Sequence, residues 1–456
     1  MKSKTIYFCK NCGHESPKWL GKCPGCGEWN SFIEESVATG KGKTKARKFG
    51  ERVKPVKLNE IQQGDEVRIK MPSTEFNRVL GGGLVTGSLT LLGGEPGVGK
   101  STLLLQNILS MRNRKILYIS GEESASQLKM RADRLGKISD NTFILCETDL
   151  DNIFAQIDNI KPDLVIVDSV QTVASPEIES AAGSVSQVRE CAASLLRYAK
   201  TNNIPVILVG HINKDGAIAG PKVLEHIVDT VLQFEGDRQY LFRILRSIKN
   251  RFGSTSEIGL YEMVQKGLKE VSNPSQIMMT ETYDEDMSGI AIGVTTEGVR
   301  PFMVEIQALV SSAAYGTPQR SVTGFDPRRL NMLLAVLEKR ARFRLGQKDV
   351  FLNIAGGLKI TDPAIDLAVV AAVMSSNFDI SISRDTAFIG EVGLSGEVRP
   401  VTRIEGRISE ASKMGMKRIF IPKGNLKGVS VKSEAEIIEV SRVENCFREM
   451  TKKTSG

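Results

Sequence analysis

Residues 89–109 read LTLLGGEPGVGKSTLLLQNIL, and this stretch predicts the architecture of the chain more directly than any other. Residues 89–92 are an apolar run typical of a buried strand, and residues 102–109 have the apolar spacing of a helix. The segment between them matches Gly-x-x-x-x-Gly-Lys-Ser, whose backbone N–H groups can surround phosphates at a helix start. We predict that Lys100 contacts the β- and γ-phosphates of a nucleotide and that the Ser101 hydroxyl binds Mg²⁺. The expected nucleotide contacts in this segment are Gly94, Glu95, Pro96, Gly97, Val98, Gly99, Lys100, Ser101 and Thr102.

Further strands are expected to bring polar side chains beside this loop. Residues 115–120 predict a second strand that leads to Glu122 and Glu123, and a carboxylate on a neighbouring strand can orient the water that attacks the γ-phosphate. The apolar run DLVIVDS contains Asp168 at the end of a strand buried on both faces, where it would hold Mg²⁺ through water. Another such strand ends at His211. The alternation of strands with helical stretches predicts a parallel α/β sheet with ligands at the carboxyl ends of its strands.

Residues 80–102, with a glycine-rich turn before the loop described above, resemble the RecA/DnaB-like ATPases. This resemblance implies that Glu122 is the catalytic carboxylate, with Glu123 as the alternative. It also implies that His211 senses the γ-phosphate and links it to DNA-binding loops; a histidine that caps a loop or helix is the alternative. If a ring of subunits encloses DNA, the loop after His211 would contact its phosphates through Lys214 and Lys222.

Four cysteines near the N-terminus predict a zinc ribbon. They form two Cys-x-x-Cys pairs, Cys9 with Cys12 and Cys23 with Cys26, and two such turns supply four thiolates to a tetrahedral zinc ion. A site closed by four thiolates is structural, and its metal would supply the folding free energy of a segment too small to build its own core. Trp19 and Trp29, the two tryptophans of the chain, flank the second pair. We expect them to pack the ribbon; a surface for a partner or a base is the alternative.

Residues 249–253, Lys-Asn-Arg-Phe-Gly, look like the signature pentapeptide of the bacterial RadA/Sms proteins. With the ribbon, the P-loop and the tail described next, this extends the resemblance over essentially the whole chain. In relatives of this kind, cations from a neighbouring subunit complete the ATP site. The resemblance therefore implies that Lys249 and Arg251 act in trans and neutralise charge in the transition state. A basic strand end that contacts DNA phosphates is the alternative, and the two roles are compatible.

From about residue 273 the sequence resembles the Lon proteolytic domain over roughly 170 residues. Ala364 occupies the position of the catalytic serine and Glu405 that of the lysine, so we predict the fold without proteolysis. The resemblance implies side-by-side assembly into a six-membered ring. Basic residues are dense between 320 and 348, and on a helix Arg328 and Arg329 would be part of a cationic face for DNA, with a solvated surface helix as the alternative.

Charge and hydropathy limit the class of protein. The net charge of +8 permits nucleic-acid binding, and residues 41–57 contain eight Lys or Arg residues against one Glu, as in a flexible basic linker. The longest apolar run, residues 367–374, is too short to span a membrane and predicts a buried helix. The first residues have no apolar region of a signal peptide. We expect a cytoplasmic, nucleoid-associated protein without membrane contact.

The sequence thus predicts an α/β protein with four parts: a zinc ribbon (1–35), a basic linker (36–58), a RecA-like P-loop ATPase core (59–272) and an α+β Lon-protease-like domain (273–456). The RadA/Sms resemblance implies a hexameric, DNA-dependent ATPase that uses ATP, Mg²⁺ and Zn²⁺. It would translocate on single-stranded DNA as a helicase-type motor and drive branch migration of recombination intermediates with a RecA-type recombinase. The alternatives are an ATP-gated DNA clamp that does not unwind and a KaiC-like protein-remodelling ATPase.

Overall fold

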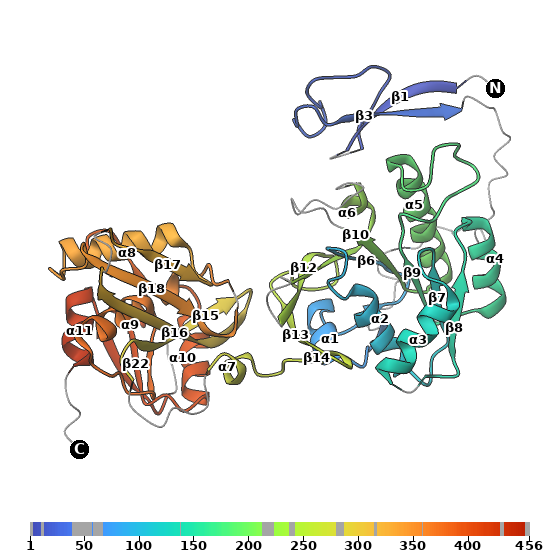
Figure 1. Cartoon of the computed structure of the whole chain (residues 1–456). Helices are drawn as coiled ribbons and strands as arrows, with labels where there is room; N and C mark the ends of the chain where they lie inside the picture. Colours follow the sequence, from blue (N-terminus) through green and yellow to red (C-terminus); the bar gives the residue numbers. More distant parts are fainter. Residues whose placement is uncertain are drawn as a thin grey trace. The chain divides into compact units, whose positions relative to one another are not determined.

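A computed structural model of the chain describes residues 3–10, 13–38, 57, 67–136, 138–211, 223–236, 242–279, 287–313, 317–357, 359–428 and 433–451. These residues divide into two compact units, Met1–Val271 and Ser272–Gly456 (Figure 1). The first unit contains the cysteine-rich segment and the P-loop, and the second contains the Lon-like tail. The finer limits drawn from the sequence, 1–35 and 36–58, stay predictions.

The N-terminal segment is a small antiparallel sheet. Its strands follow the order β2-β1-β3, with bounds β1 Ser3–Cys9, β2 Glu15–Ser16 and β3 Phe32–Ala38. Its hydrophobic cluster is formed by Cys9, Cys23 and Phe32, with Tyr7 and Leu20 packed against them. So small a cluster is consistent with a segment that needs a metal ion to fold.

The rest of the first unit is built on a nine-stranded sheet with the order β14-β13-β12-β11-β6-β10-β9-β7-β8. The strands from β11 to β8 run parallel, and β12, β13 and β14 extend the sheet as antiparallel strands. The strand bounds are β6 Leu89–Gly94, β7 Ile116–Ser120, β8 Thr142–Cys146, β9 Leu164–Asp168, β10 Val206–His211, β11 Thr230–Glu235, β12 Phe242–Asn250, β13 Ile258–Val264 and β14 Gly267–Glu270. A short pair, β4 Arg68–Ile69 and β5 Leu84–Val85, lies outside this sheet.

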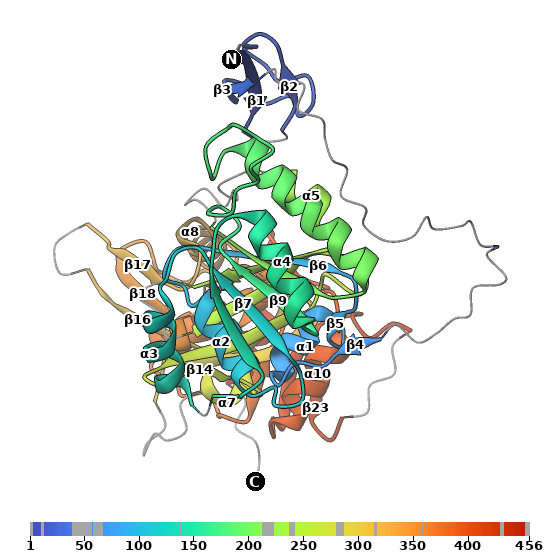
Figure 2. The same ribbon diagram turned by 90° about the vertical axis from the view of Figure 1, so that its right-hand side faces the viewer.

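Helices cover both faces of the large sheet, because its strands alternate apolar side chains between two clusters. One cluster joins Leu92, Tyr118 and Ile166 to helices α1, α2 and α3. The other joins Leu91, Leu117 and Val165 to helices α4, α5 and α6 (Figures 1 and 2). The helix bounds are α1 Thr74–Leu80, α2 Lys100–Leu109, α3 Ala125–Leu135, α4 Leu150–Ile160, α5 Val185–Asn202 and α6 Val223–Ile227. This is the doubly covered α/β sheet predicted from the sequence.

One detail of the predicted topology is wrong. The strand that leads to Glu122 was expected beside the P-loop strand. In the structure β10 and β9 lie between β6 and β7, so the strand next in sequence is three places away in the sheet. Apolar runs identify strands but carry little information about which strands pair.

The second unit has a seven-stranded sheet with the order β17-β18-β16-β15-β19-β22-β23. Helix α9, which contains the apolar run 367–374, is buried as predicted, and Gly293 of β15 allows its close approach, since a Cβ there would lie 3.1 Å from that of Ala368. Helix α10 packs on the side chains of Ile292 and Val294 of the same strand, and so on the other face. The bounds are β15 Ile290–Glu297, β16 Arg300–Ser312, β17 Arg320–Thr323, β18 Lys348–Ile354, β19 Thr386–Phe388, β20 Glu391–Val392, β21 Val398–Arg399, β22 Arg418–Pro422, β23 Glu436–Val440, α7 Pro274–Ile277, α8 Pro327–Lys339, α9 Asp366–Phe378, α10 Ile404–Lys413 and α11 Val443–Met450.

Candidate functional site

The P-loop connects the end of β6 to the start of α2. Gly97 and Gly99 have φ angles of 80° and 111°, and such left-handed backbone lets the loop curl without steric cost. Lys100 begins the helix and is 5% exposed. Its Nζ donates hydrogen bonds to the carbonyls of Gly94 at 2.8 Å and Glu95 at 3.0 Å, so the ammonium lies inside the curl of the loop.

The charge of Lys100 is balanced by two acidic residues, one at the end of β9 and one just after β7. Burial lowers the pKa of Lys100, while the carboxylates of Asp168 and Glu122 act in the opposite direction. The Lys100 Nζ also lies 3.4 Å from Nδ1 of His211 at the end of β10. A partly desolvated ammonium of this kind is suited to binding the phosphates of a nucleotide.

Glu122 faces this site. Its Oε1 accepts a hydrogen bond from the Ser169 hydroxyl at 2.6 Å and lies 3.1 Å from Nε2 of His211. Burial by itself raises the pKa of Glu122, but the hydrogen bonds from Ser169 and His211 and the charge of Lys100 outweigh it, so the pKa is lowered. A carboxylate that stays ionised next to the phosphate-binding lysine can accept a proton from water.

Glu123 has partners other than Ser169 and His211. Its carboxylate forms an ion pair with Arg131 of helix α3, and its backbone N–H donates to the Ser120 hydroxyl at 3.0 Å. Of the two acids that the sequence left open, Glu122 is therefore the one that the fold brings to Ser169 and His211.

Tyr118 is a member of the site that sequence reasoning missed. It is fully buried on β7, and its hydroxyl donates a hydrogen bond to Oδ2 of Asp168. The same hydroxyl is hydrogen-bonded to Ser101, so it lies between the two residues predicted to bind Mg²⁺. Burial and the adjacent Asp168 carboxylate raise the pKa of Tyr118, which therefore stays a neutral donor. A tyrosine inside an apolar strand carries no motif, and only the pairing of β7 with β9 brings it to Asp168.

The residues around Tyr118 fit a magnesium ion. Ser101 and Asp168 offer hydroxyl and carboxylate oxygens within reach of one hydroxyl group, and oxygen ligands of this kind suit Mg²⁺ beside substrate phosphates. The chain uses Mg²⁺ with ATP, and these two residues would hold it.

Replacing Tyr118 by phenylalanine should weaken magnesium binding. The Tyr118→Phe change removes one donor to Asp168 and leaves the ring, so we expect the Mg²⁺ midpoint for ATP binding to rise about tenfold, as for loss of a hydrogen bond to a charged group. The measurement is a Mg²⁺ titration of fluorescent ATP binding, with hydrolysis followed in parallel. Tyr261→Phe is the matched control, because the buried Tyr261 hydroxyl bonds Ser73 at 2.9 Å within the core. An unchanged or lower midpoint in Tyr118→Phe contradicts the role.

Lys249 and Arg251 lie away from the P-loop of their own chain. Lys249 lies at the end of β12, and Arg251 directly follows this strand. Because β12 is antiparallel to β11 and β11 is parallel to the P-loop strand β6, both residues lie at the end of the strands opposite the P-loop. The Lys249 Nζ donates to the carbonyls of Glu225 at 2.6 Å and Val228 at 2.8 Å. Arg251 pairs with the buried Asp229 at 3.1 Å. Neither cation can reach the nucleotide of the same subunit in this arrangement.

Three of the four predicted zinc ligands converge. The Sγ atoms of Cys9, Cys23 and Cys26 all lie within 4.8 Å of one another, and those of Cys9 and Cys26 are 3.7 Å apart. Tetrahedral zinc with sulfur ligands at about 2.3 Å requires sulfur atoms about 3.8 Å apart, so the donor set fits the ion. Cys12 lies outside the described residues. The glycines after each pair, Gly13 and Gly27, have φ angles of 69° and 76°, which the two turns require. The chain binds zinc here as a structural ion.

Loss of one zinc ligand should unfold the ribbon and leave the ATP site intact. We expect Cys23→Ser to lose its zinc, because a site of three thiolates binds the ion weakly and the ribbon has little core of its own. Metal analysis and protease sensitivity of the N-terminus test this, with ATP binding measured in parallel. Cys146→Ser, at an exposed cysteine on β8, is the control and should retain zinc. Full zinc content in Cys23→Ser would contradict the assignment.

The two protease positions of the tail lie in different surroundings. Ala364 is fully buried in the turn before α9, and Glu405 is exposed on α10. Two residues after Glu405, the buried Arg407 forms an ion pair with Asp362 at 2.7 Å and donates to the carbonyl of Val294 at 2.7 Å. A paired guanidinium next to Ala364 supplies neither nucleophile nor base. The absence of proteolysis stays a prediction.

The basic residues between 320 and 348 do not all lie on one helix, as the expected cationic face requires. Arg328 is exposed on α8, but the neighbouring Arg329 forms an ion pair with the buried Asp366. Arg320 belongs to strand β17, and the remaining arginines follow the end of the helix: Arg340, Arg342 and Arg344. DNA contact through Arg328 and Arg329 stays a prediction, and Lys214 and Lys222 lie outside the described residues.

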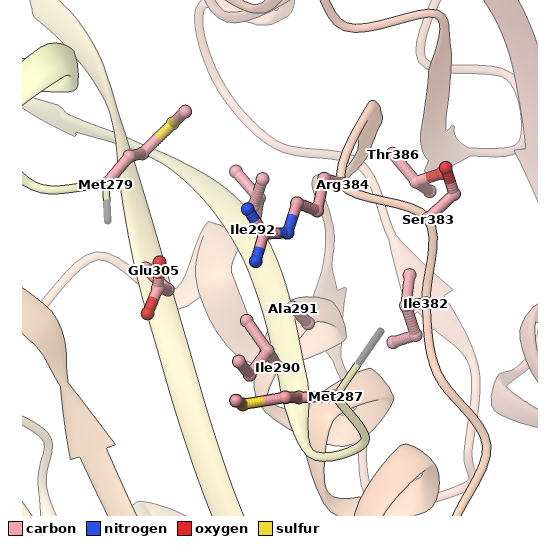
Figure 3. A pocket seen from close by; sticks show the side chains of 10 residues that line it. All are labelled: Met279, Met287, Ile290, Ala291, Ile292, Glu305, Ile382, Ser383, Arg384 and Thr386. Carbon is pink, nitrogen blue, oxygen red and sulfur yellow. The ribbon is translucent and has the colours of Figure 1, made fainter. Parts of the chain in front are cut away.

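A pocket in the second unit belongs to no predicted site (Figure 3). It opens between β15, β16 and the segment before β19. Methionine and isoleucine side chains form its apolar part, and Arg384 and Glu305 contribute charges. The lining residues are Met279, Met287, Ile290, Ala291, Ile292, Glu305, Ile382, Ser383, Arg384 and Thr386.

Among the described residues, no helix has the length and apolar content to cross a bilayer.

Comparisons with known proteins find matches in the cysteine-rich segment, in the segment that contains the P-loop and in the tail. Residues 7–34 match the family described as "Rubredoxin metal binding domain", residues 55–217 match "AAA domain" and residues 307–425 match "Subunit ChlI of Mg-chelatase". The chain is 51% identical over 453 residues to "DNA repair protein RadA" of Bacillus subtilis, which covers 98% of each chain. It is 49% identical over 443 residues to the protein of the same name from Streptococcus pyogenes, covering 97% of this chain and 98% of that one. A solved KaiC-like protein, PH0186 of Pyrococcus horikoshii, aligns with 45% of this chain and 99% of its own at 20% identity and a TM-score of 0.37.

Proposed function

The chain belongs to the RadA family of DNA repair proteins, and on that premise we propose that it is a DNA-dependent ATPase motor. The motor would assemble as a hexameric ring, translocate on single-stranded DNA as a helicase and promote branch migration during homologous recombination. The chain hydrolyses ATP with Mg²⁺, and its ribbon holds zinc. The coupling of hydrolysis to DNA is what the proposal adds.

Hydrolysis follows from the side chains at the ends of β6, β7, β9 and β10. Lys100 would neutralise the β- and γ-phosphates of a bound nucleotide, and Ser101 and Asp168 would hold the Mg²⁺ that screens them. Glu122 orients the attacking water and accepts its proton on a carboxylate oxygen, for which its lowered pKa keeps it ionised. The Ser169 hydroxyl fixes the position of this carboxylate.

The observation that carries the proposal is the position of His211. Its two ring nitrogens lie 3.4 Å from Lys100 and 3.1 Å from Glu122, so it touches both the phosphate-binding and the water-activating side chain. A γ-phosphate entering between Lys100 and Glu122 would compete for these contacts and move the ring. Because residues 212–222 follow directly in sequence and contain Lys214 and Lys222, such a movement could be passed to a DNA-binding loop. This supports nucleotide-dependent DNA contact.

The place of Lys249 and Arg251 at the end of the strands opposite the P-loop supports a ring. In a ring, these cations would neutralise charge on the transferred phosphate of a neighbouring subunit. We propose that the ring encloses single-stranded or branched DNA and that Arg328 adds contact to its phosphates. The proposed partner is a RecA-type recombinase, at the nucleoid in the cytoplasm.

The proposal is tested by steady-state ATP hydrolysis with and without single-stranded DNA. We expect DNA to accelerate hydrolysis several-fold and Lys100→Ala to abolish it, because Lys100 carries the phosphate contact. Strand-displacement and branch-migration assays on the wild type then test the motor. Hydrolysis that is indifferent to DNA argues against the coupling. DNA-stimulated hydrolysis without strand displacement would favour an ATP-gated clamp.

A further inference from the structure

The two tryptophans of the ribbon are exposed. Trp19 is 52% and Trp29 is 67% accessible to solvent, and neither belongs to the hydrophobic cluster of Cys9, Cys23 and Phe32. The expectation that they pack the ribbon is therefore wrong. Burying one large apolar side chain is worth about 1.5–3 kcal/mol, so a segment with so small a core gives up stability by leaving both rings in water. Exposed aromatic groups of this kind are typical of a binding surface.

The rings flank a position without a side chain. A Cβ on Gly21 would lie 3.8 Å from Trp19 and 3.9 Å from Trp29, so both rings border the same small space. The backbone of Lys22 pairs with that of Trp29. This pairing holds Trp29 next to the turn that contains Trp19. Because Gly21 has no side chain, this position does not fill the space that the two rings border.

A cation accompanies these rings. The Lys22 Nζ lies 5.5 Å from the centre of the Trp29 ring, and Lys18, next to Trp19, is exposed as well. Over residues 17–29 the two lysines face a single acid, Glu28, and the chain continues after the ribbon with the basic residues of 41–57. Aromatic rings beside ammonium groups match a strand of stacked bases with phosphates on one side.

We propose that Trp19 and Trp29 form a stacking site for the bases of single-stranded nucleic acid, with Lys22 next to the adjoining phosphate. The site is a second contact to the strand, separate from the ATPase core, and it binds without regard to sequence because every base has a flat aromatic face. It rests on the proposed DNA binding of the chain.

Tryptophan fluorescence gives a direct test, because the chain has two tryptophans and both belong to this site. We expect single-stranded oligodeoxythymidine to quench the fluorescence of the full-length, zinc-bound protein. An abasic oligonucleotide of equal length and charge should quench it far less. Trp19→Phe and Trp29→Phe each leave one reporter, and quenching in both variants assigns the stacking to both rings.

Affinity provides the second measurement. The double change Trp19→Ala with Trp29→Ala should weaken single-strand binding about tenfold, which corresponds to about 1.4 kcal/mol and to the loss of one stacked base. The double phenylalanine variant should retain most of the affinity. Leu394→Ala, at another exposed apolar residue, is the control, and zinc content reports that the ribbon is folded.

Three outcomes would overturn the proposal. Equal quenching by the abasic strand would mean phosphate contact alone, and unchanged affinity in the double alanine variant would mean that the rings take no part. Quenching by a recombinase protein but not by DNA would assign the surface to a protein partner. In each case DNA-stimulated ATP hydrolysis can persist, so the stacking site fails alone, whereas a wild type that binds no DNA contradicts the proposed function as well.

Discussion

Glu122→Gln is expected to lower the rate of ATP hydrolysis about 10²–10⁴-fold while ATP binding remains. The amide keeps the size of the side chain and a hydrogen-bond acceptor for Ser169, but it cannot take a proton from the attacking water. Lys100 and Ser101, which contact the phosphates and Mg²⁺, are unchanged. The measurement is single-turnover hydrolysis at saturating ATP, together with an equilibrium titration of ATP.

Glu123→Gln is the matched control for this change. The Glu123 carboxylate pairs with Arg131 on helix α3, so its loss should leave hydrolysis within a few-fold of the wild type. Partly exposed ion pairs contribute little to stability, and we expect a small change in Tm. If Glu123→Gln abolishes hydrolysis and Glu122→Gln does not, the assignment of the catalytic carboxylate is reversed.

Arg251→Ala and Lys249→Ala should each lower hydrolysis strongly, by about 10³-fold or more if the side chain acts as a finger on the neighbouring subunit. The reason is the loss of positive charge next to the transferred phosphate. Each change also has a structural cost. Arg251→Ala leaves the buried Asp229 with the backbone N–H of Leu89 at 3.1 Å and Lys200 at 3.6 Å, and Lys249→Ala removes the donor to two carbonyls at the end of helix α6. Thermal unfolding is therefore measured for each variant.

Mixed assemblies separate a trans role from a folding defect. Chains with Arg251→Ala have an intact P-loop, and chains with Lys100→Ala have an intact arginine. Where the P-loop of an Arg251→Ala chain meets Arg251 of a Lys100→Ala chain, the interface contains both Lys100 and Arg251. The mixture should therefore hydrolyse ATP although neither variant does so alone. Arg246→Ala is the control on the same strand, since Arg246 pairs with Glu235 at 2.8 Å. A mixture without activity, or loss of activity that only follows loss of stability, contradicts the trans role.

Much of the site is encoded in short, continuous stretches. The P-loop, the strand that ends in Asp168 and the cysteine pairs each depend on residues close in sequence, and the nucleotide and zinc assignments follow from that spacing. The same holds for Ala364 at the expected serine position. Such features are predictable because the chemistry of a turn or a helix start requires particular residue types at fixed intervals.

Tertiary structure decided what depends on distant pairing. The order of the strands separates β6 from β7 by two others, and this order brings Tyr118 to Asp168 and Glu122 to His211. Apolar periodicity shows that a strand is buried but does not name its neighbour.

The solvent exposure of individual side chains and their ion-pair partners could not be predicted from the sequence either. The tryptophans of the ribbon, expected in its core, face solvent, and Arg329, expected on a surface for DNA, pairs with a buried acid. An aromatic or cationic side chain suits both a core and a surface, because it has an apolar body and a polar or charged part. Its environment is therefore set by the residues that folding brings around it, and these come from other parts of the chain.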